Sequence, residues 1–289
     1  MHTAGQSVLL IHHKKSVAGS IDKNGVSIRE LSGKVVRAHI KTKTRLSRHD
    51  KPELVLVTVK AYDVEEVASL LKKSIGDGVP VLSLQNGLGN IDTLERYLGS
   101  DSIVAGTTTE GALTRGPGRV IHTGRGMTWL GEINGKLSER CLEIGRAFCA
   151  AGFPTAISNN IQGVLWTKAI VNSAINPIAA IARVRNGELH KTTELREISL
   201  RVIDEGIDVA KASGIFLKPS PKRLLTSTLA LTAKNKSSML QDIETGRKTE
   251  IRQLNGTISH LGRLVGVSTP LNDLLTRLVL FLERSQDRL

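Results

Sequence analysis

The spacing of apolar residues changes near residue 156, and this change constrains the fold more than any other feature of the sequence. Before it, short apolar runs such as Ser7–Ile11, Leu54–Val59 and Val79–Leu84 alternate with segments of helical spacing. Runs that are apolar on both faces are typical of buried parallel strands. After it, helical spacing dominates and strand signals are nearly absent. The sequence therefore predicts an α/β domain over residues 1–156, followed by an all-α domain over residues 157–289.

Helices and further strands can be assigned along both halves. The predicted helices are Tyr62–Lys73, Ile91–Leu98, Asn160–Ala182, Thr192–Ser213, Pro221–Thr232, Ser238–Leu264 and Pro270–Arg288, and the further strands are Ile103–Gly106, Arg119–His122 and Met127–Gly131. Gly214 and Gly266 fall where glycines that end helices belong. The alternation in the first half predicts a mostly parallel, Rossmann-like sheet. Such an architecture suits a nucleotide-dependent dehydrogenase with its site between the domains, although a fold alone fixes no chemistry.

The charge of the chain is strongly positive, but it does not favour a nucleic-acid-binding protein. The formal net charge is +13, from 40 Lys and Arg against 27 Asp and Glu, while only 3% of residues are aromatic. Few aromatic residues means few platforms on which bases can stack. The densest basic stretch, Arg37–Lys51, contains Lys41, Lys43, Arg45 and Arg48 and is interpreted as a solvated loop. A basic surface also attracts an anionic cofactor and a carboxylate substrate.

Neither the cysteines nor the apolar runs point to a disulfide, a metal site or a membrane anchor. Cys141 and Cys149 are the only cysteines. Eight residues apart on one predicted helix, they lie about 12 Å apart along its axis, too far to pair, so both are expected to pack in the interior. No Cys/His cluster has metal-ligand spacing. No apolar run approaches the roughly 18 residues of a membrane span, and the first residues lack a secretory signal, so a cytoplasmic location is expected.

The segment Leu165–Pro177 is the most informative for chemistry. Lys168, Asn172 and Asn176 stand at positions i, i+4 and i+8, so they share one face of a helix. The neighbouring residues Ala169, Ile170, Val171, Ala174 and Ile175 are apolar. This polar stripe needs partners, which are either polar groups of a second helix or a ligand. A desolvated lysine has a lowered pKa and suits proton donation near neutral pH, and asparagine amides can both donate to and accept from a hydroxy acid.

A second polar segment runs from Asn235 to Glu250. Ser238 is predicted in the first turn of a long helix, where it can hold a carboxylate or cap the helix with Gln241 as its partner. Glu250 falls about three turns further on and, taken alone, is interpreted as an exposed helix carboxylate.

These segments resemble the ketopantoate reductase family. The resemblance rests on ordered motifs across nearly the whole chain: Val59-Lys60-Ala61-Tyr62, Leu84-Gln85-Asn86-Gly87-Leu88-Gly89, Gly106-Thr107-Thr108-Thr109, His122-Thr123-Gly124, Leu130-Gly131-Glu132, Trp166-Thr167-Lys168 with its two spaced Asn, Asn186-Gly187-Glu188-Leu189, Ser237–Ile243 and Thr249-Glu250-Ile251. It implies an NADPH-dependent reduction of 2-dehydropantoate to pantoate, a step toward coenzyme A.

The resemblance also implies a role for individual residues. Lys168 would protonate the carbonyl oxygen as hydride arrives. The substrate would be held at its hydroxyl and oxo groups by Asn172, Asn176 and Asn186, and at its carboxylate by Asn235, Lys236, Ser237 and Ser238. The cofactor would be contacted by Lys60, Asn86, Ala112 and, from the helical domain, Glu250.

The sequence departs from the family at its beginning. No strand followed by G-x-G-x-x-G precedes Ser7, although such a turn normally cradles the pyrophosphate. Gly5 resembles the glycine that ends the first helix, so the first βα unit, about 20 residues, is expected to be missing. Either the start lies upstream or the gene is shortened, and we favour the first. A shortened sheet would lose a central strand and expose apolar surface.

The position that grips the 2′-phosphate of NADPH also departs from the family pattern. It holds His13 and Lys14 instead of the usual Arg, so NADH stays open as the cofactor. The other departure is Arg252, which follows Thr249-Glu250-Ile251 where the family often has an acidic residue.

Two alternatives to the leading function stay open. One is reduction of another branched or hydroxylated 2-oxoacid by the same residues in a different pocket. The other is a non-catalytic remnant whose helical domain serves dimerisation or binding. The partner expected in the first case is a small-molecule 2-oxoacid, with no nucleic acid and no membrane, and the formation of a homodimer is left open.

Overall fold

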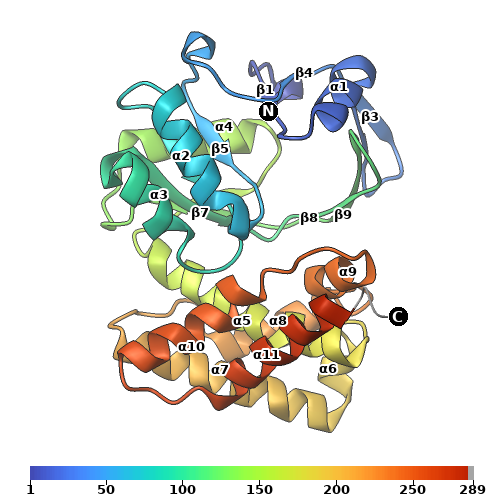
Figure 1. The fold of residues 1–289 in the computed structure, drawn as a ribbon, viewed down its shortest axis with the longest axis vertical. Helices are drawn as coiled ribbons and strands as arrows, with labels where there is room; N and C mark the ends of the chain where they lie inside the picture. The colour runs from blue at the N-terminus through green and yellow to red at the C-terminus, as the bar shows by residue number, and fades with distance from the viewer. Residues whose placement is uncertain (286–289) are drawn as a thin grey trace. The chain divides into compact units, whose positions relative to one another are not determined.

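The computed structural model describes residues 1–285 and divides into two compact units (Figure 1). The sheet unit comprises Met1–Thr58, Glu65–Leu84 and Thr93–Ile161. The helical unit comprises Val59–Val64, Gln85–Asp92 and Gln162–Leu289. Two short segments from the first half of the chain therefore group with the helices of the second half.

The sheet unit is built around a five-stranded sheet in the order β11-β10-β7-β6-β5. Its strands are β5 (Val55–Val57), β6 (Val81–Ser83), β7 (Ile103–Thr108), β10 (Thr128–Gly131) and β11 (Thr155–Ile157). β5, β6 and β7 are parallel to one another, whereas β10 runs antiparallel to β7. All residues of β6 are buried, as expected for a strand covered on both faces. The mostly parallel sheet predicted from the sequence is present.

Two smaller sheets complete this unit. β1 (Leu9–Ile11) pairs in parallel with β4 (Lys41–Lys43). The third sheet has the order β3-β2-β9-β8 and comprises β2 (Val26–Arg29), β3 (Val35–Ala38), β8 (Gly111–Thr114) and β9 (Arg119–Gly124). The interpretation of Arg37–Lys51 as a solvated loop was wrong at its start, because Arg37 lies in β3 and Lys41 to Lys43 form β4.

The helices of the sheet unit are α1 (Lys15–Asn24), α2 (Val64–Ser74), α3 (Asn90–Leu98) and α4 (Glu139–Ala150), the ends of α2 and α3 reaching into the helical unit. Gly5 adopts a left-handed conformation (φ +82°) and ends a short 3₁₀ turn, His2–Ala4. Both cysteines lie on α4 and are free, as predicted. Cys141 is buried, but Cys149 is exposed, so the expectation that both pack in the interior was wrong for Cys149.

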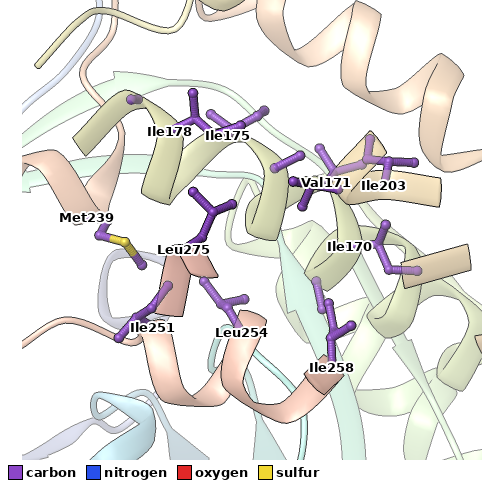
Figure 2. Close-up of a cluster of buried hydrophobic side chains, with 14 of the residues drawn as sticks. Ile170, Val171, Ile175, Ile178, Ile203, Met239, Ile251, Leu254, Ile258 and Leu275 are labelled. Atoms are coloured by element: carbon purple, nitrogen blue, oxygen red, sulfur yellow. The ribbon is translucent and has the colours of Figure 1, made fainter. Parts of the chain in front are cut away.

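The helical unit packs seven helices, among the residues that the structure describes, around one apolar core (Figure 2). They are α5 (Ile161–Ala182), α6 (Glu188–Lys191), α7 (Thr193–Ala212), α8 (Pro221–Leu231), α9 (Ser238–Glu244), α10 (Asn255–Leu264) and α11 (Pro270–Ser285). The core joins Ile170 and Ile175 of α5 to Ile203 of α7, Ile258 of α10 and Leu275 of α11. The predicted C-terminal end of the last helix, residues 286–288, lies outside the described residues.

The central helix α5 runs uninterrupted past an internal proline. Pro177 has no N–H to donate to the carbonyl four residues earlier, which belongs to Ser173. That carbonyl instead accepts a 2.9 Å hydrogen bond from Asn255 Nδ2. Asn255 also donates to Asn272 Oδ1, 3.0 Å away. A buried amide thus compensates for the proline, and α5 keeps Lys168, Asn172 and Asn176 on one face.

The predicted helix Ser238–Leu264 is in fact three elements. α9 ends at Glu244, a 3₁₀ turn spans Ile251–Gln253, and α10 begins at Asn255. The cause is Gly246, which has a φ of +67° and follows the C-cap residue Thr245. A left-handed glycine at this position terminates a helix. The prediction of one continuous helix through Thr245 and Gly246 was therefore wrong.

One helix among residues 1–285, α5, has the length and apolar composition of a membrane span. The expectation that no apolar segment approaches the length of a membrane span was therefore wrong for α5. Yet 72% of the stretch is buried inside the protein, as is usual for the core helix of a globular fold.

Candidate active site

Helix α5 brings Lys168 to a loop from much earlier in the chain. Lys168 Nζ donates a 2.9 Å hydrogen bond to Asn86 Oδ1. Asn86 follows β6 and lies in Gln85–Asp92, one of the two early segments that belong to the helical unit. The loop is closed by Asn90, whose Nδ2 donates to the carbonyl of Asn86 at 2.9 Å. The residues predicted as proton donor and as cofactor contact are therefore in direct contact.

The second early segment, Val59–Val64, brings Lys60 to two buried carboxylates. Lys60 Nζ lies 2.6 Å from Asp242 Oδ2 and 3.8 Å from Glu250 Oε2. The other oxygen of Glu250 accepts a 3.0 Å hydrogen bond from the Ala61 N–H. Glu250 is thus buried and bound, and its interpretation as an exposed helix carboxylate was wrong.

Asp242 was not identified from the sequence. It is buried on α9 between the core residues Leu240 and Ile243. A carboxylate on the apolar face of a helix needs a partner, because its burial unpaired is costly. That spacing was the signal that could have identified it.

The two lysines respond differently to burial. Burial lowers the pKa of Lys168 to about 8, and the negative charge of Glu250 offsets part of this shift. Burial also acts to lower the pKa of Lys60, but Glu250 and Asp242 outweigh it and the pKa is raised. Lys60 therefore stays charged at ordinary pH values, whereas Lys168 can release a proton slightly above neutral pH.

The substrate residues predicted after α5 lie around two connected turns. Asn186 N–H donates to the Asn235 carbonyl at 3.0 Å, and Asn186 Nδ2 donates to Thr232 Oγ1 at 2.9 Å. The Asn186 Oδ1 atom is buried and has no hydrogen-bond partner among residues 1–285. Ser237 donates to the carbonyl of Asn176 at 3.4 Å, which connects these turns to α5.

The cap of α9 is Ser237 and not Ser238. Ser237 Oγ accepts a 3.1 Å hydrogen bond from the Leu240 N–H, whereas Ser238 is the first helical residue and is exposed. Gln241 does not complete a capping box with Ser238, because its Nε2 donates to the carbonyl of Lys236. The Lys236 ammonium forms an exposed 2.5 Å ion pair with Glu244.

Three of the predicted cofactor residues belong to the sheet unit. His13 and Lys14 are exposed and directly precede α1. Ala112 lies on β8 opposite His122 of β9, beside an irregularity in the strand pairing. Glu110 fastens this hairpin, because its carboxylate accepts from the Gly126 N–H at 3.0 Å and contacts His122 Nε2 at 2.8 Å.

Known proteins show to which family this arrangement belongs. The model of the family Ketopantoate reductase PanE/ApbA matches residues 1–135, and that of its C-terminal domain matches residues 160–283. The 2-dehydropantoate 2-reductase of Pyrococcus horikoshii is 38% identical over 275 residues, which cover 95% of this chain and 89% of the relative. The chain belongs to the ketopantoate reductase family. The 2-dehydropantoate 2-reductase of Archaeoglobus fulgidus is 35% identical to this chain, over 96% of this chain and 90% of the relative.

Solved structures agree with this assignment to the ketopantoate reductase family. The ternary structure of D-mandelate dehydrogenase with NADH and anilino(oxo)acetate matches with a TM-score of 0.92 and 28% identity, covering 99% of this chain and 93% of that one. A PanE/ApbA family ketopantoate reductase from Ralstonia eutropha JMP134 matches with a TM-score of 0.89 and 29% identity, over the same shares of the two chains. The predicted fold class, α/β followed by all-α, is confirmed.

The ketopantoate reductase fold implies a nicotinamide dinucleotide as cofactor. Three residues of the helical unit offer hydrogen-bonding groups to such a cofactor. Glu250 uses one oxygen for the Ala61 N–H, and a carboxylate has about four acceptor positions, so acceptors are left for ribose hydroxyls. Lys60 and Asn86 add an ammonium and an amide within the same unit. These donors and acceptors have the chemistry that binds ribose hydroxyls. The sequence contains no G-x-G-x-x-G turn for the pyrophosphate.

Proposed function

We propose that this chain reduces the 2-oxo group of 2-dehydropantoate to the hydroxyl group of pantoate, with NADPH as the hydride donor. The observation that carries the proposal is the hydrogen bond to Asn86 Oδ1 from the partly buried Lys168, whose pKa is lowered by burial to about 8. The identity to 2-dehydropantoate 2-reductases, 35–38% over at least 95% of the chain, supports this substrate.

Lys168 supplies the proton in this reaction. NADPH, when bound, supplies the hydride that the carbonyl carbon accepts. The carbonyl oxygen then gains negative charge and takes a proton from Lys168 Nζ, so that the C=O group becomes CH–OH and the lysine becomes neutral. With a pKa of about 8, Lys168 is mostly protonated at neutral pH and is regenerated by a proton from solvent.

Asparagine amides are proposed to orient the substrate. Asn172 and Asn176 follow Lys168 by one and two turns of α5, and amides can both donate to and accept from a hydroxyl group. The buried Asn186 Oδ1 lacks a partner among residues 1–285, which supports a role as acceptor for a substrate hydroxyl. The segment formed by Asn235, Lys236, Ser237 and Ser238 is proposed to bind the carboxylate.

Six residues are proposed to contact the cofactor. Lys60, Asn86 and Glu250 would contact the cofactor, and Ala112 would contact it as well. His13 and Lys14 are proposed to meet the 2′-phosphate, since both are exposed cationic or titratable groups at the start of a helix. The D-mandelate dehydrogenase structures contain NADH, so the choice of NADPH rests on these two residues.

The test is the oxidation of NADPH by the purified chain in the presence of 2-dehydropantoate. We expect Lys168→Ala to lower kcat by about 10²–10⁴-fold while NADPH binding, followed by cofactor fluorescence, is retained. Lys211→Ala, which removes an exposed lysine of α7, is the control and should keep kcat. A higher kcat/KM with a different 2-oxoacid, such as phenylglyoxylate, would contradict the assigned substrate.

A further inference from the structure

We propose that the 3₁₀ turn Ile251–Gln253 fixes Asn86 against Lys168, and that Gly87 is the positioning residue that permits this. The inference rests on the proposed function only in so far as Lys168 is the proton donor. It concerns how the donor is held, which the proposed reaction leaves open.

The backbone of Gly87 lies directly on the turn. Gly87 has a φ of +88°, and a Cβ atom at this position would lie 2.6 Å from the carbonyl oxygen of Gln253 and 3.0 Å from its Cβ. The first distance is shorter than real side chains tolerate. The next residue completes the contact, because the Leu88 N–H donates a 2.9 Å hydrogen bond to the same Gln253 carbonyl.

The Leu88 side chain anchors the loop as well. It is 9% exposed and belongs to the apolar core of the helical unit, together with Ile251 of the turn and Leu254, which follows the turn. Asn90 closes the loop through the carbonyls of Asn86 and Gly87. Backbone and side-chain contacts therefore fix the position of Asn86 Oδ1, which accepts from Lys168 Nζ.

The residue before the same turn holds the segment Val59–Val64. Glu250 precedes the turn, and its carbonyl accepts from the N–H groups of Gln253 and Leu254, both at 3.1 Å. Its carboxylate accepts from Ala61 N–H. One short turn thus aligns the Lys60 segment and the Asn86 loop, so displacing the loop from Gln253 alters the environment of Lys168 without removing any group that touches it.

The test compares two glycines of the same loop. Gly89 also has a positive φ, +83°, but a Cβ there would have nothing within 4 Å. Gly87→Ala and Gly89→Ala therefore carry similar backbone strain, and only the first collides with the turn. The readouts are kcat, KM and the pH dependence of Lys168 labelling by an amine-reactive reagent, measured by mass spectrometry without substrate.

We expect Gly87→Ala to lower kcat by about 10–100-fold with little change in KM, because small displacements of a proton donor are costly. Asn86 accepts from the charged lysine, so its displacement should lower the apparent pKa of Lys168 in the labelling profile. Asn86→Ala should produce the same shift. Gly89→Ala should keep both the labelling profile and kcat.

Equal behaviour of Gly87→Ala and Gly89→Ala would overturn the inference, since strain alone would then explain both. If Gly87→Ala fails to fold, Leu88→Ala, which removes the anchor and keeps both glycines, should shift the labelling profile in the same direction; an unchanged profile overturns the inference. Labelling needs no substrate, so a chain that reduces no 2-oxoacid would contradict the proposed function and still test the positioning of Lys168.

Discussion

Lys60 Nζ lies 2.6 Å from Oδ2 of Asp242, and the two residues are 182 positions apart in the chain. With Glu250 close to Lys60 and attracting Lys168, two ammonium groups are matched by two carboxylates. The two carboxylates are buried and need such matching, because an unpaired buried charge is strongly unfavourable.

Asp242→Asn should destabilise the chain, because Lys60 would lose its closest partner. About one third of the Lys60 side chain is exposed, so solvent screening limits the expected cost to about 1 kcal/mol. Urea unfolding at pH 7 measures the effect. Glu244→Gln is the control on the same helix, since its pair with Lys236 is exposed and should contribute less than about 0.5 kcal/mol. Equal losses in the two variants would refute the importance of the Lys60 contact.

The rate of reduction should fall as the pH rises through about 8, because neutral Lys168 has no proton to donate. Glu250 favours the charged lysine, so Glu250→Gln should move this limb of the kcat profile to lower pH. The measurement is kcat at saturating substrate from about pH 6 to about pH 10. A limb that stays in place in Glu250→Gln would assign it to another group.

Lys14→Ala should weaken NADPH binding more than NADH binding. An exposed ammonium that contacts a 2′-phosphate contributes on the order of 1 kcal/mol, which corresponds to about a fivefold change in Kd. The two dissociation constants are compared by cofactor fluorescence at low and high salt, where screening should reduce the NADPH effect. Lys15→Ala removes the neighbouring exposed charge and serves as control. An equal loss for both cofactors would place the 2′-phosphate elsewhere.

Arg140→Ala should destabilise the sheet unit by about 2–3 kcal/mol, because it leaves the Glu132 carboxylate buried without its guanidinium partner. Arg140 donates to both oxygens of Glu132 at 2.6 Å. Burial acts to raise the pKa of Glu132, but the hydrogen bonds from Arg140 and Ser138 outweigh it and the pKa lies below its ordinary value of 4.5.

The contribution of this pair is therefore fully present above about pH 4.5 and is lost as the pH falls through the lowered pKa. The difference in unfolding free energy between the two chains should shrink accordingly in acid. Arg146→Ala on the same helix removes an exposed pair with Glu139 and should cost less than about 0.5 kcal/mol. A pH-independent difference would show that Arg140 acts through packing alone.

The sequence predicted the helices of the second half well where periodicity was long and uninterrupted. α5 and α7 begin and end within one residue of their predicted bounds. The α9–α10 region failed because Gly246 and the 3₁₀ turn interrupt a pattern that remains apolar throughout. In the first half, β2, β3 and β8 were missed because each is only four residues long and partly exposed, too short for its apolar pattern to be distinctive.

The candidate site likewise contains residues that local sequence patterns identify and contacts that they do not. Lys168, Asn172 and Asn176 could be found from helical spacing, because they belong to one continuous helix. The contacts of Lys168 with Asn86 and of Lys60 with Asp242 join residues 82 and 182 positions apart, and no local pattern encodes them. The assignment of Lys60, Asn86 and Glu250 came from family resemblance, and the burial of Glu250 came from the structure.

The grouping of Val59–Val64 and Gln85–Asp92 with the later helices has a consequence for the modularity of the chain. A fragment that starts at Gln162 would leave a hole where Leu88 packs, and the Glu250 carboxylate would lose the Ala61 N–H. The helical half alone therefore lacks contacts that stabilise it in the whole chain. Recombination or gene fusion at residue 161 would separate Lys168 from the loop that accepts its hydrogen bond.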